Sequence, residues 1–182
     1  MTTWKDWADD LTARVAGAVK SRRTALGLTA ADLAARTSVG KPLTRAVISD
    51  LETGRKKSLE VTELLTLAAA LDIPPMLLLF PDYPDGTVEV IPGEQRTTVD
   101  AASWFSGTWT GPSSESPENP GVLLVRALRD RDDRIIQTVL IETGEASSED
   151  ELAATREHLR KLVKLYQRQA DQNKSKVWGE DA

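Results

Sequence analysis

The segment that most limits what this chain can fold into is LTRAVISDLETGRKK, residues 43–57, because it marks both ends of a short helix. Its apolar residues recur at steps of three and four, which is the spacing that places side chains on one face of a helix. These residues are Leu43, Val47, Ile48 and Leu51. Thr44 can accept a hydrogen bond from a backbone N–H of the first turn, and Gly54 can adopt the left-handed conformation that ends a helix. The segment therefore predicts one capped helix over residues 44–53.

Two helical patterns come before this segment. The first keeps apolar residues on one face from Leu11 to Leu26 and ends at Gly27. The second begins at Thr29, because Asp32 three residues later completes a capping box, in which each side chain accepts from the other residue's backbone N–H. A turn, SVGKPL, then separates the second pattern from the capped helix.

Two more helical patterns follow the basic triplet RKK. LEVTELLTLAAALDI, residues 59–73, is apolar at helical spacing. PPMLLLF, residues 74–80, begins with prolines that suit the first turn of a helix. Together, these patterns predict five short helices in a compact, all-helical domain over residues 1–81.

Charge is distributed unevenly along the chain. The net charge is −5, which taken alone argues against a nucleic acid partner. From Arg14 to Lys57, however, ten Lys and Arg face three acids, a local charge of +7, whereas from Tyr83 to the end twelve bases face eighteen acids. Partners respond to the local field rather than to the average charge. The basic stretch is also the one that contains the capped helix.

Several classes of protein are disfavoured. The chain has no cysteine, so neither a disulfide nor a thiolate metal site can hold its fold. Its start, MTTWKDWADD, has no apolar run, and no segment reaches the roughly 20 apolar residues of a membrane helix. The one histidine, His158, lies within a late helical pattern, and no HExxH, phosphate-binding or dinucleotide-binding motif occurs. We therefore expect a cytoplasmic protein that is not an enzyme and needs no cofactor or metal.

The spacing of LT, DLA and LTRAVISDLETGRKK resembles the DNA-binding domain of lambda-repressor and Cro-type regulators, the XRE family, of phage or actinobacterial type. Its most specific part runs from Thr44 to Lys56 as T-x-x-x-I-S-x-L-E-x-G-x-K, together with KSRRTALGLT upstream. The resemblance covers about residues 8–81. It implies five helices, with the second and third forming a helix-turn-helix and the third lying in the major groove.

The resemblance also implies an ion pair between Arg23 and Glu52. The alternative for Glu52 is a surface pair with Lys56 at the helical i,i+4 spacing. Two features depart from the family pattern. The turn after the second helix is longer than usual, and Ala30 occupies the position that commonly holds a phosphate-binding glutamine.

The polar face of the helix over residues 44–53 carries the candidate base readers, which are Arg45, Ala46, Ser49 and Asp50. Arginine can donate two hydrogen bonds to guanine, alanine can contact a thymine methyl, and aspartate can accept from cytosine N4. Basic and hydroxyl side chains around the helix ends are candidates for the phosphates, which fix position rather than sequence. The candidate phosphate contacts are Thr29, Lys41, Thr44, Arg55, Lys56 and Lys57. The alternative is an ordinary solvated helix face.

Residues 82–121 predict an irregular connector. TVEVI predicts a short strand, and VDAASWFSGTW predicts a brief helix with Trp104 and Phe105. We favour packing as the role of these two rings over ligand binding. TGPSSESPENPG, residues 110–121, has the composition of a linker.

Residues 122–182 predict a helical C-terminal region. GVLLVRALRDRDDRIIQTVLIE admits one helix or two strands, and we favour the helix, with a stripe of Leu124, Leu128, Ile135 and Val139. SSEDELAATREHLRKLVKLYQRQADQ predicts a helix capped by Ser148, with acids in its first turn and bases in its last. Its stripe consists of Leu152, Leu159, Leu162, Val163 and Tyr166. This stripe forms either an intramolecular helical hairpin or the seam of a dimer.

The sequence thus predicts a mainly α protein: a five-helix lambda-repressor-like DNA-binding domain, a short irregular and β segment, and a C-terminal helical region. The functional hypothesis is a sequence-specific transcriptional regulator of double-stranded DNA, a repressor that acts as a homodimer. The C-terminal half would serve assembly or sensing, and the PPMLLLF helix is the alternative dimer seam. The rival hypothesis is an antitoxin-like adaptor whose C-terminal half binds a partner protein.

Overall fold

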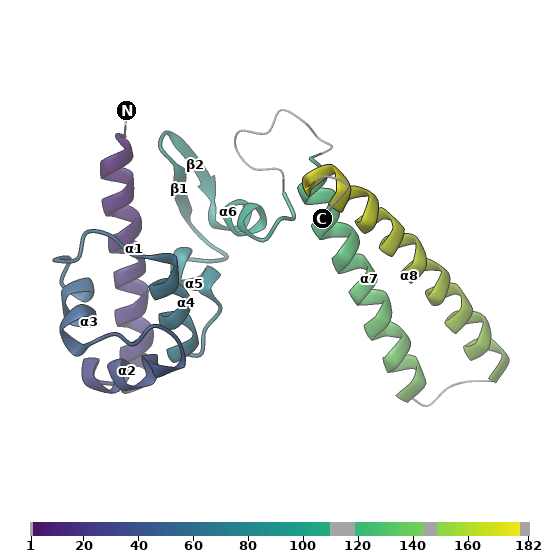
Figure 1. The fold of residues 1–182 in the computed structure, drawn as a ribbon, viewed down its shortest axis with the longest axis horizontal. Coiled ribbons are helices and arrows are strands. Elements are labelled where there is room, and N and C mark those ends of the chain that lie inside the picture. The colour runs from purple at the N-terminus through teal and green to yellow at the C-terminus, as the bar shows by residue number, and fades with distance from the viewer. Residues whose placement is uncertain (1, 110–118, 144–148, 179–182) are drawn as a thin grey trace. The chain divides into compact units, whose positions relative to one another are not determined.

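The chain forms two compact units, Met1–Ala102 and Ser103–Ala182, in a computed structural model that describes residues 2–109, 119–143 and 149–178. Most of the described residues are helical, which confirms the predicted fold class. Each unit is described by itself below (Figure 1).

The first unit contains the five predicted helices. They are α1 (Trp4–Ala25), α2 (Ala30–Arg36), α3 (Arg45–Glu52), α4 (Val61–Ala70) and α5 (Pro75–Leu79), with a 3-10 turn, η1 (Thr37–Val39), after α2. Helix α1 is longer than its apolar pattern, because Thr3 caps it by accepting from the N–H of Asp6. Helix α3 is slightly shorter than predicted, with Thr44 and Thr53 as its caps.

One hydrophobic core joins all five helices. Its most deeply buried side chains are Val15 and Val19 of α1, Leu33 of α2, Ile48 and Leu51 of α3, Leu67 of α4, Leu71 just after α4, and Leu78 of α5. Burying a side chain of this size stabilises the fold by about 1.5–3 kcal/mol relative to leaving it exposed. Helix α3 contributes its apolar face to this core, so its polar face is directed away from it.

The predicted caps are present. The hydroxyl of Thr29 accepts from the N–H of Asp32 at 3.1 Å, and Asp32 accepts from the N–H of Thr29 at 2.8 Å, which completes the capping box. The hydroxyl of Thr44 accepts from the N–H of Val47 at 3.3 Å. Gly54 has a φ of 72°, a left-handed conformation that favours glycine and that follows the end of α3.

A small hairpin and a helix complete the first unit. Strands β1 (Thr87–Ile91) and β2 (Glu94–Thr97) pair antiparallel, with a register shift between Glu89 and Ile91. Helix α6 (Thr98–Phe105) follows and reaches into the second unit. A second apolar cluster consists of Phe80, Val88, Val90, Ala101 and Ala102. The indole N–H of Trp7 donates to the carbonyl of Glu89 at 3.1 Å, which ties the start of α1 to the hairpin.

The second unit is a helical hairpin of α7 (Pro120–Thr143) and α8 (Glu149–Trp178), which lie side by side and antiparallel (Figure 1). The preference for one helix over two strands in residues 121–142 is therefore confirmed. The buried side chains of the hairpin include Val122, Ala127, Leu159 and Ala170. Gln167 of α8 accepts from Arg131 of α7 at 2.7 Å.

The apolar stripes of the hairpin are only partly covered. On α8, Leu159 is buried and Leu152, Leu162, Val163 and Tyr166 are half-buried, which fits the intramolecular hairpin, one of the two alternatives for this stripe. On α7, Leu124 and Leu128 are half-buried, whereas Ile135 and Val139 are exposed. Trp104 and Phe105 keep 37% and 55% of their surface exposed, so packing covers only part of either residue. The predicted cap Ser148 and most of the predicted linker lie outside the described residues.

Candidate nucleic-acid interface

The four predicted base readers all lie on α3, opposite its buried face. Arg45 and Ala46 in the first turn are exposed, and Ser49 and Asp50 one turn later are half-buried. On the opposite face, Ile48 and Leu51 retain 0% and 2% of their surface. The side of α3 that carries the four candidates is therefore the side that a large ligand can reach.

Asp50 is engaged with Arg55 just past the helix end. Its Oδ1 accepts from Nε at 2.7 Å and lies 2.6 Å from Nη2. Both side chains are largely exposed, at 46% for Asp50 and 63% for Arg55. The contact orients the Arg55 guanidinium beside the polar face of α3. It leaves Oδ2 as the carboxylate oxygen for an outside donor.

The beginnings of α2 and α3 each present a threonine. Thr29 and Thr44 are both exposed N-caps, so each hydroxyl lies beside the free backbone N–H groups of a first helical turn. Hydrogen bonds from the Thr29 side chain and backbone lower the pKa of Asp32 below its ordinary value. Ala30 is the first residue of α2 and offers no polar group of its own.

Arg23 and Glu52 form a two-pronged ion pair. Nε lies 2.6 Å from Oε1 and Nη2 lies 2.8 Å from Oε2, while Nη1 donates to the carbonyl of Leu28 at 2.6 Å. The two side chains are only 15% and 8% exposed. The hydrogen bond to Glu52 raises the pKa of the Arg23 guanidinium above its ordinary value. One arginine of α1 thus ties the last residue of α3 to the segment that precedes α2.

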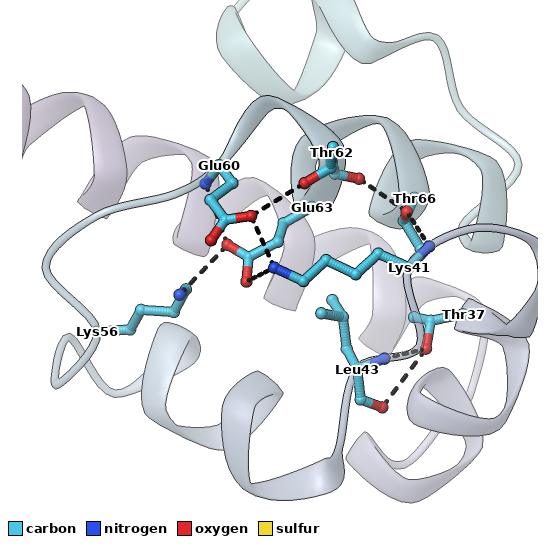
Figure 2. A network of polar contacts seen from close by, with 8 residues as sticks. All are labelled: Thr37, Lys41, Leu43, Lys56, Glu60, Thr62, Glu63 and Thr66. Carbon is cyan, nitrogen blue, oxygen red and sulfur yellow. Dashed lines mark hydrogen bonds and ion pairs between the residues drawn. The ribbon is translucent and has the colours of Figure 1, made fainter.

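Lys41 and Lys56, both predicted at phosphates, contact the acids Glu60 and Glu63 at the start of α4 (Figure 2). The ammonium of Lys41 lies 2.7 Å from Oε2 of Glu60 and 3.5 Å from Oε1 of Glu63. The ammonium of Lys56 lies 3.2 Å from Oε2 of Glu63. The Lys41–Glu60 hydrogen bond raises the pKa of Lys41 and lowers that of Glu60.

Sequence reasoning missed both acids. The spacing of Glu60 and Glu63 is that of a helix start, and this signal was available in the sequence. Their lysine partners could not be found in the same way, because Lys41 lies far from α4 along the chain and the segment from Lys56 to α4 has no regular spacing that would predict a contact.

Three further basic side chains of the first unit differ in whether they have partners. Arg22 donates to the carbonyls of Leu71 and Asp72 at 3.2 and 3.1 Å, at the end of α4 rather than on α3. Arg45 and Lys57 are exposed, and within the part of the chain that the structure describes neither has an ion-pair partner. These two cations are therefore the ones beside α3 that are available to an anionic ligand.

Helix α2, the extended turn and α3 have the arrangement in which a first helix supports a second, exposed one. Residues 19–78 match the family model described as helix-turn-helix. No curated protein and no solved structure gives a match. The family-model match covers about a third of the chain and supports a helix-turn-helix domain of the lambda-repressor and Cro type, the XRE family, as found in DNA-binding transcriptional regulators. This family is a DNA-binding fold and not a family of enzymes.

The described residues form neither a metal site nor a membrane span. No group of three or more acidic, histidine or cysteine side chains is placed to hold a metal ion there. Within the same residues, no helix is both long and apolar enough to cross a membrane.

Proposed function

We propose that this protein is a sequence-specific transcriptional repressor that reads the major groove of double-stranded DNA with α3. The observation that carries the proposal is the placement of Arg45 and Ala46, exposed in the first turn of the second helix of the helix-turn-helix. The first turn of this helix is the part that reaches base edges. Repression is the simpler mode of regulation, because occupancy of a promoter is sufficient for it.

Each residue of the polar face has a distinct proposed role. Arg45 donates to O6 and N7 of guanine, Ala46 contacts a thymine methyl, and Asp50 accepts from cytosine N4 through Oδ2. Ser49 is half-buried, so its hydroxyl can reach a base edge only where α3 lies deep in the groove. The contact with Arg55 limits Asp50 to one free oxygen, so we rank Arg45 first among the readers.

The proposed phosphate contacts surround this face. Thr29 and Thr44 offer helix N-termini, whose free N–H groups and partial positive charge bind phosphate. Arg55 and Lys57 follow the end of α3 and are exposed. Lys41 and Lys56 reach phosphates only if they leave their acidic partners on α4.

We further propose that two copies bind one site, through the C-terminal hairpin. A single reading helix covers only a few base pairs, so useful specificity requires two of them. The hairpin carries exposed apolar residues, namely Ile135, Ile136, Val139 and Leu165, each 44–57% exposed. A groove of about 290 Å³ lies between α7 and α8, lined by Ile135, Thr138, Val139, Arg160, Val163 and Lys164. A second copy of the hairpin would cover this surface.

The same exposed surface also favours the rival function, in which the hairpin binds a different protein and DNA binding is secondary. The mass of the purified protein separates the two. A homodimer supports the repressor. A protein that stays monomeric favours the adaptor.

The proposed function is tested by selecting sequences from a random pool of DNA duplexes with the full chain. We expect enrichment of one inverted repeat. Arg45→Ala should relax the preference at one base pair in each half-site, since a bidentate guanine contact contributes about 1–3 kcal/mol of discrimination. Arg168→Ala, which removes the same charge from exposed α8, is the matched control and should leave the preference unchanged. A pool with no enriched sequence would overturn the proposal.

A further inference from the structure

Both chain segments that flank α3 are fastened to one side chain of α4, that of Glu63. Lys41 belongs to the extended turn before α3, and Lys56 belongs to the segment after it. Their ammonium groups approach Glu63 from two directions, at 3.5 Å from Oε1 and 3.2 Å from Oε2 (Figure 2). Glu63 is therefore a single anchor for the entrance and the exit of the helix proposed to read DNA.

Glu63 is placed rigidly enough to act as an anchor. Its side chain is only 4% exposed, and Oε2 accepts from the backbone N–H of Glu60 at 3.1 Å, at the start of α4. A carboxylate this deeply buried needs compensating positive charge. Lys41 and Lys56, 41% and 24% exposed, supply that charge.

The turn is also attached to α4 through its backbone. The N–H of Lys41 donates to Oγ1 of Thr66 at 2.9 Å, and Thr66 in turn donates to the carbonyl of Thr62 at 2.7 Å (Figure 2). At Gly40 the backbone comes so close that a Cβ would lie 2.5 Å from Oγ1 of Thr66. Within the turn, the hydroxyl of Thr37 accepts from the N–H of Leu43 at 2.8 Å. Through these contacts, the position of α4 determines where the first turn of α3 lies.

We propose that Glu63 is a positioning residue for sequence reading: it holds the segments at both ends of α3 at the angle at which the base readers meet the groove. It keeps Lys56 away from phosphates, and together with Glu60 it does the same for Lys41. The inference rests on the proposed function of α3. It assigns to the two lysines a role that charge alone does not predict. Lysines that are held by acids add no phosphate contacts, so the protein discriminates better between sequences and binds DNA in general less tightly.

The substitution that isolates this role is Glu63→Gln. Glutamine has the same shape and can still accept from the N–H of Glu60, so the start of α4 keeps its cap. Only the negative charge is lost, and with it the ion pair to Lys56 and the longer of the two ion pairs to Lys41, which keeps Glu60 at 2.7 Å. Lys56 can then bind a phosphate, and such a contact steepens the fall of log K with log salt by about 0.9.

The expected result is that two affinities change in opposite directions. Glu63→Gln should bind random duplex DNA several-fold more tightly with a steeper salt slope, while the ratio of operator to random affinity falls about tenfold, the equivalent of one lost base contact. A residue that merely stabilised the fold would weaken both affinities together. Glu60→Gln is the matched comparison: this exposed acid is the closer partner of Lys41, and its loss leaves both ion pairs of Glu63 in place, so its ratio should fall less than that of Glu63→Gln.

A measurement without DNA accompanies this test. Amide hydrogen exchange at Lys41 and Lys56 should quicken in Glu63→Gln, while exchange at Leu71, whose N–H donates within the core to Leu67, stays unchanged. If Glu63→Gln does not fold, Thr66→Val decides, because it releases the backbone of the turn without changing charge. That variant should lower the ratio at an unchanged salt slope.

The outcomes separate the two proposals. A wild-type protein with no preference for any sequence defeats the proposed function. A wild-type protein with a preference that Glu63→Gln, or in its place Thr66→Val, retains in full overturns the positioning role alone.

Discussion

At the scale of single residues, the contribution of an ion pair to the stability of this protein depends on how deeply the pair is buried. The Arg23–Glu52 pair is almost covered, whereas the Asp50–Arg55 pair is mostly exposed, although their closest N–O distances are equal at 2.6 Å. An exposed pair gains little because water screens it, whereas breaking a buried pair leaves an uncompensated charge. The two pairs are therefore expected to contribute unequally to stability although their closest N–O distances are equal.

The first prediction compares these two pairs. Glu52→Ala should lower the free energy of unfolding by about 3 kcal/mol, because Arg23 loses both prongs of its partner while remaining mostly buried. Arg55→Ala should lower it by less than about 1 kcal/mol. Denaturant unfolding of the two variants measures both values. Near-equal values would mean that the Arg23–Glu52 pair is as well solvated as the exposed one.

A second prediction concerns acid. The pKa of Asp32 is lowered by the hydroxyl and the N–H of Thr29, so it lies below its value of about 3.9 in an unfolded chain. A group whose pKa is lower in the folded state stabilises that state fully above its unfolded pKa, and this contribution disappears as pH falls through the folded pKa. Thr29→Val removes the hydroxyl and should raise the pKa of Asp32 toward its ordinary value. An NMR titration of the Asp32 carboxyl measures the shift, and an unmoved titration would contradict the assigned cause.

At the scale of elements, sequence reasoning succeeded where the signal was local. Helices α1 to α5 follow from apolar spacing and from caps such as Thr29 and Thr44, which interact within a few residues. Strand β2 was missed because its sequence, EQRT, is polar throughout, and pairing with β1 rather than its own composition makes it a strand.

The candidate site was predictable to a similar extent. The identity of the four residues on the polar face of α3 follows from helical periodicity around Ile48 and Leu51. The anchoring of Lys41 and Lys56 on Glu63 does not, because it depends on how the turn that holds Lys41 packs on α4 and on how the chain bends between Lys56 and α4. Sequence patterns indicate which face of an element is exposed, whereas the partners of a surface lysine are set by tertiary packing.

The third prediction contrasts two glycines. Gly40→Ala places a Cβ against Thr66, whose hydroxyl already makes two hydrogen bonds and cannot easily move, so the variant should lose about 1–3 kcal/mol of stability. Gly17 lies within α1, and a Cβ there meets nothing within 4 Å. Gly17→Ala should therefore gain about 0.5–1 kcal/mol, the usual difference between the two residues inside a helix. Thermal melts of both variants measure the changes, and a harmless Gly40→Ala would show that the turn is not closely packed on α4.

At the scale of the whole molecule, the two units have unlike surfaces. The first unit exposes bases around α3 together with separate apolar residues such as Val39 and Val61, whereas the second exposes apolar residues in succession along α7, at Ile135, Ile136 and Val139. A surface that binds phosphates must stay polar, so an apolar interface for assembly is better placed on a different unit. This arrangement fits the proposal that the hairpin, and not the helix-turn-helix domain, joins two copies.

The last prediction tests assembly through the hairpin. Val139 is 52% exposed on α7, and Val139→Glu would place a charge in the proposed interface between two copies. Sedimentation should show a dimer for the wild-type chain and a monomer for the variant. Affinity for the selected inverted repeat should then fall about 100-fold or more, because the copy on the second half-site is no longer tethered to the copy on the first.

Val99→Glu makes the same change at an exposed valine of α6, and it should leave both the mass of the protein and its affinity for the repeat unchanged. A Val139→Glu protein that stays dimeric would assign assembly to another surface, and an operator whose half-sites are not about 34 Å apart, one turn of DNA, would contradict a symmetric pair of reading helices.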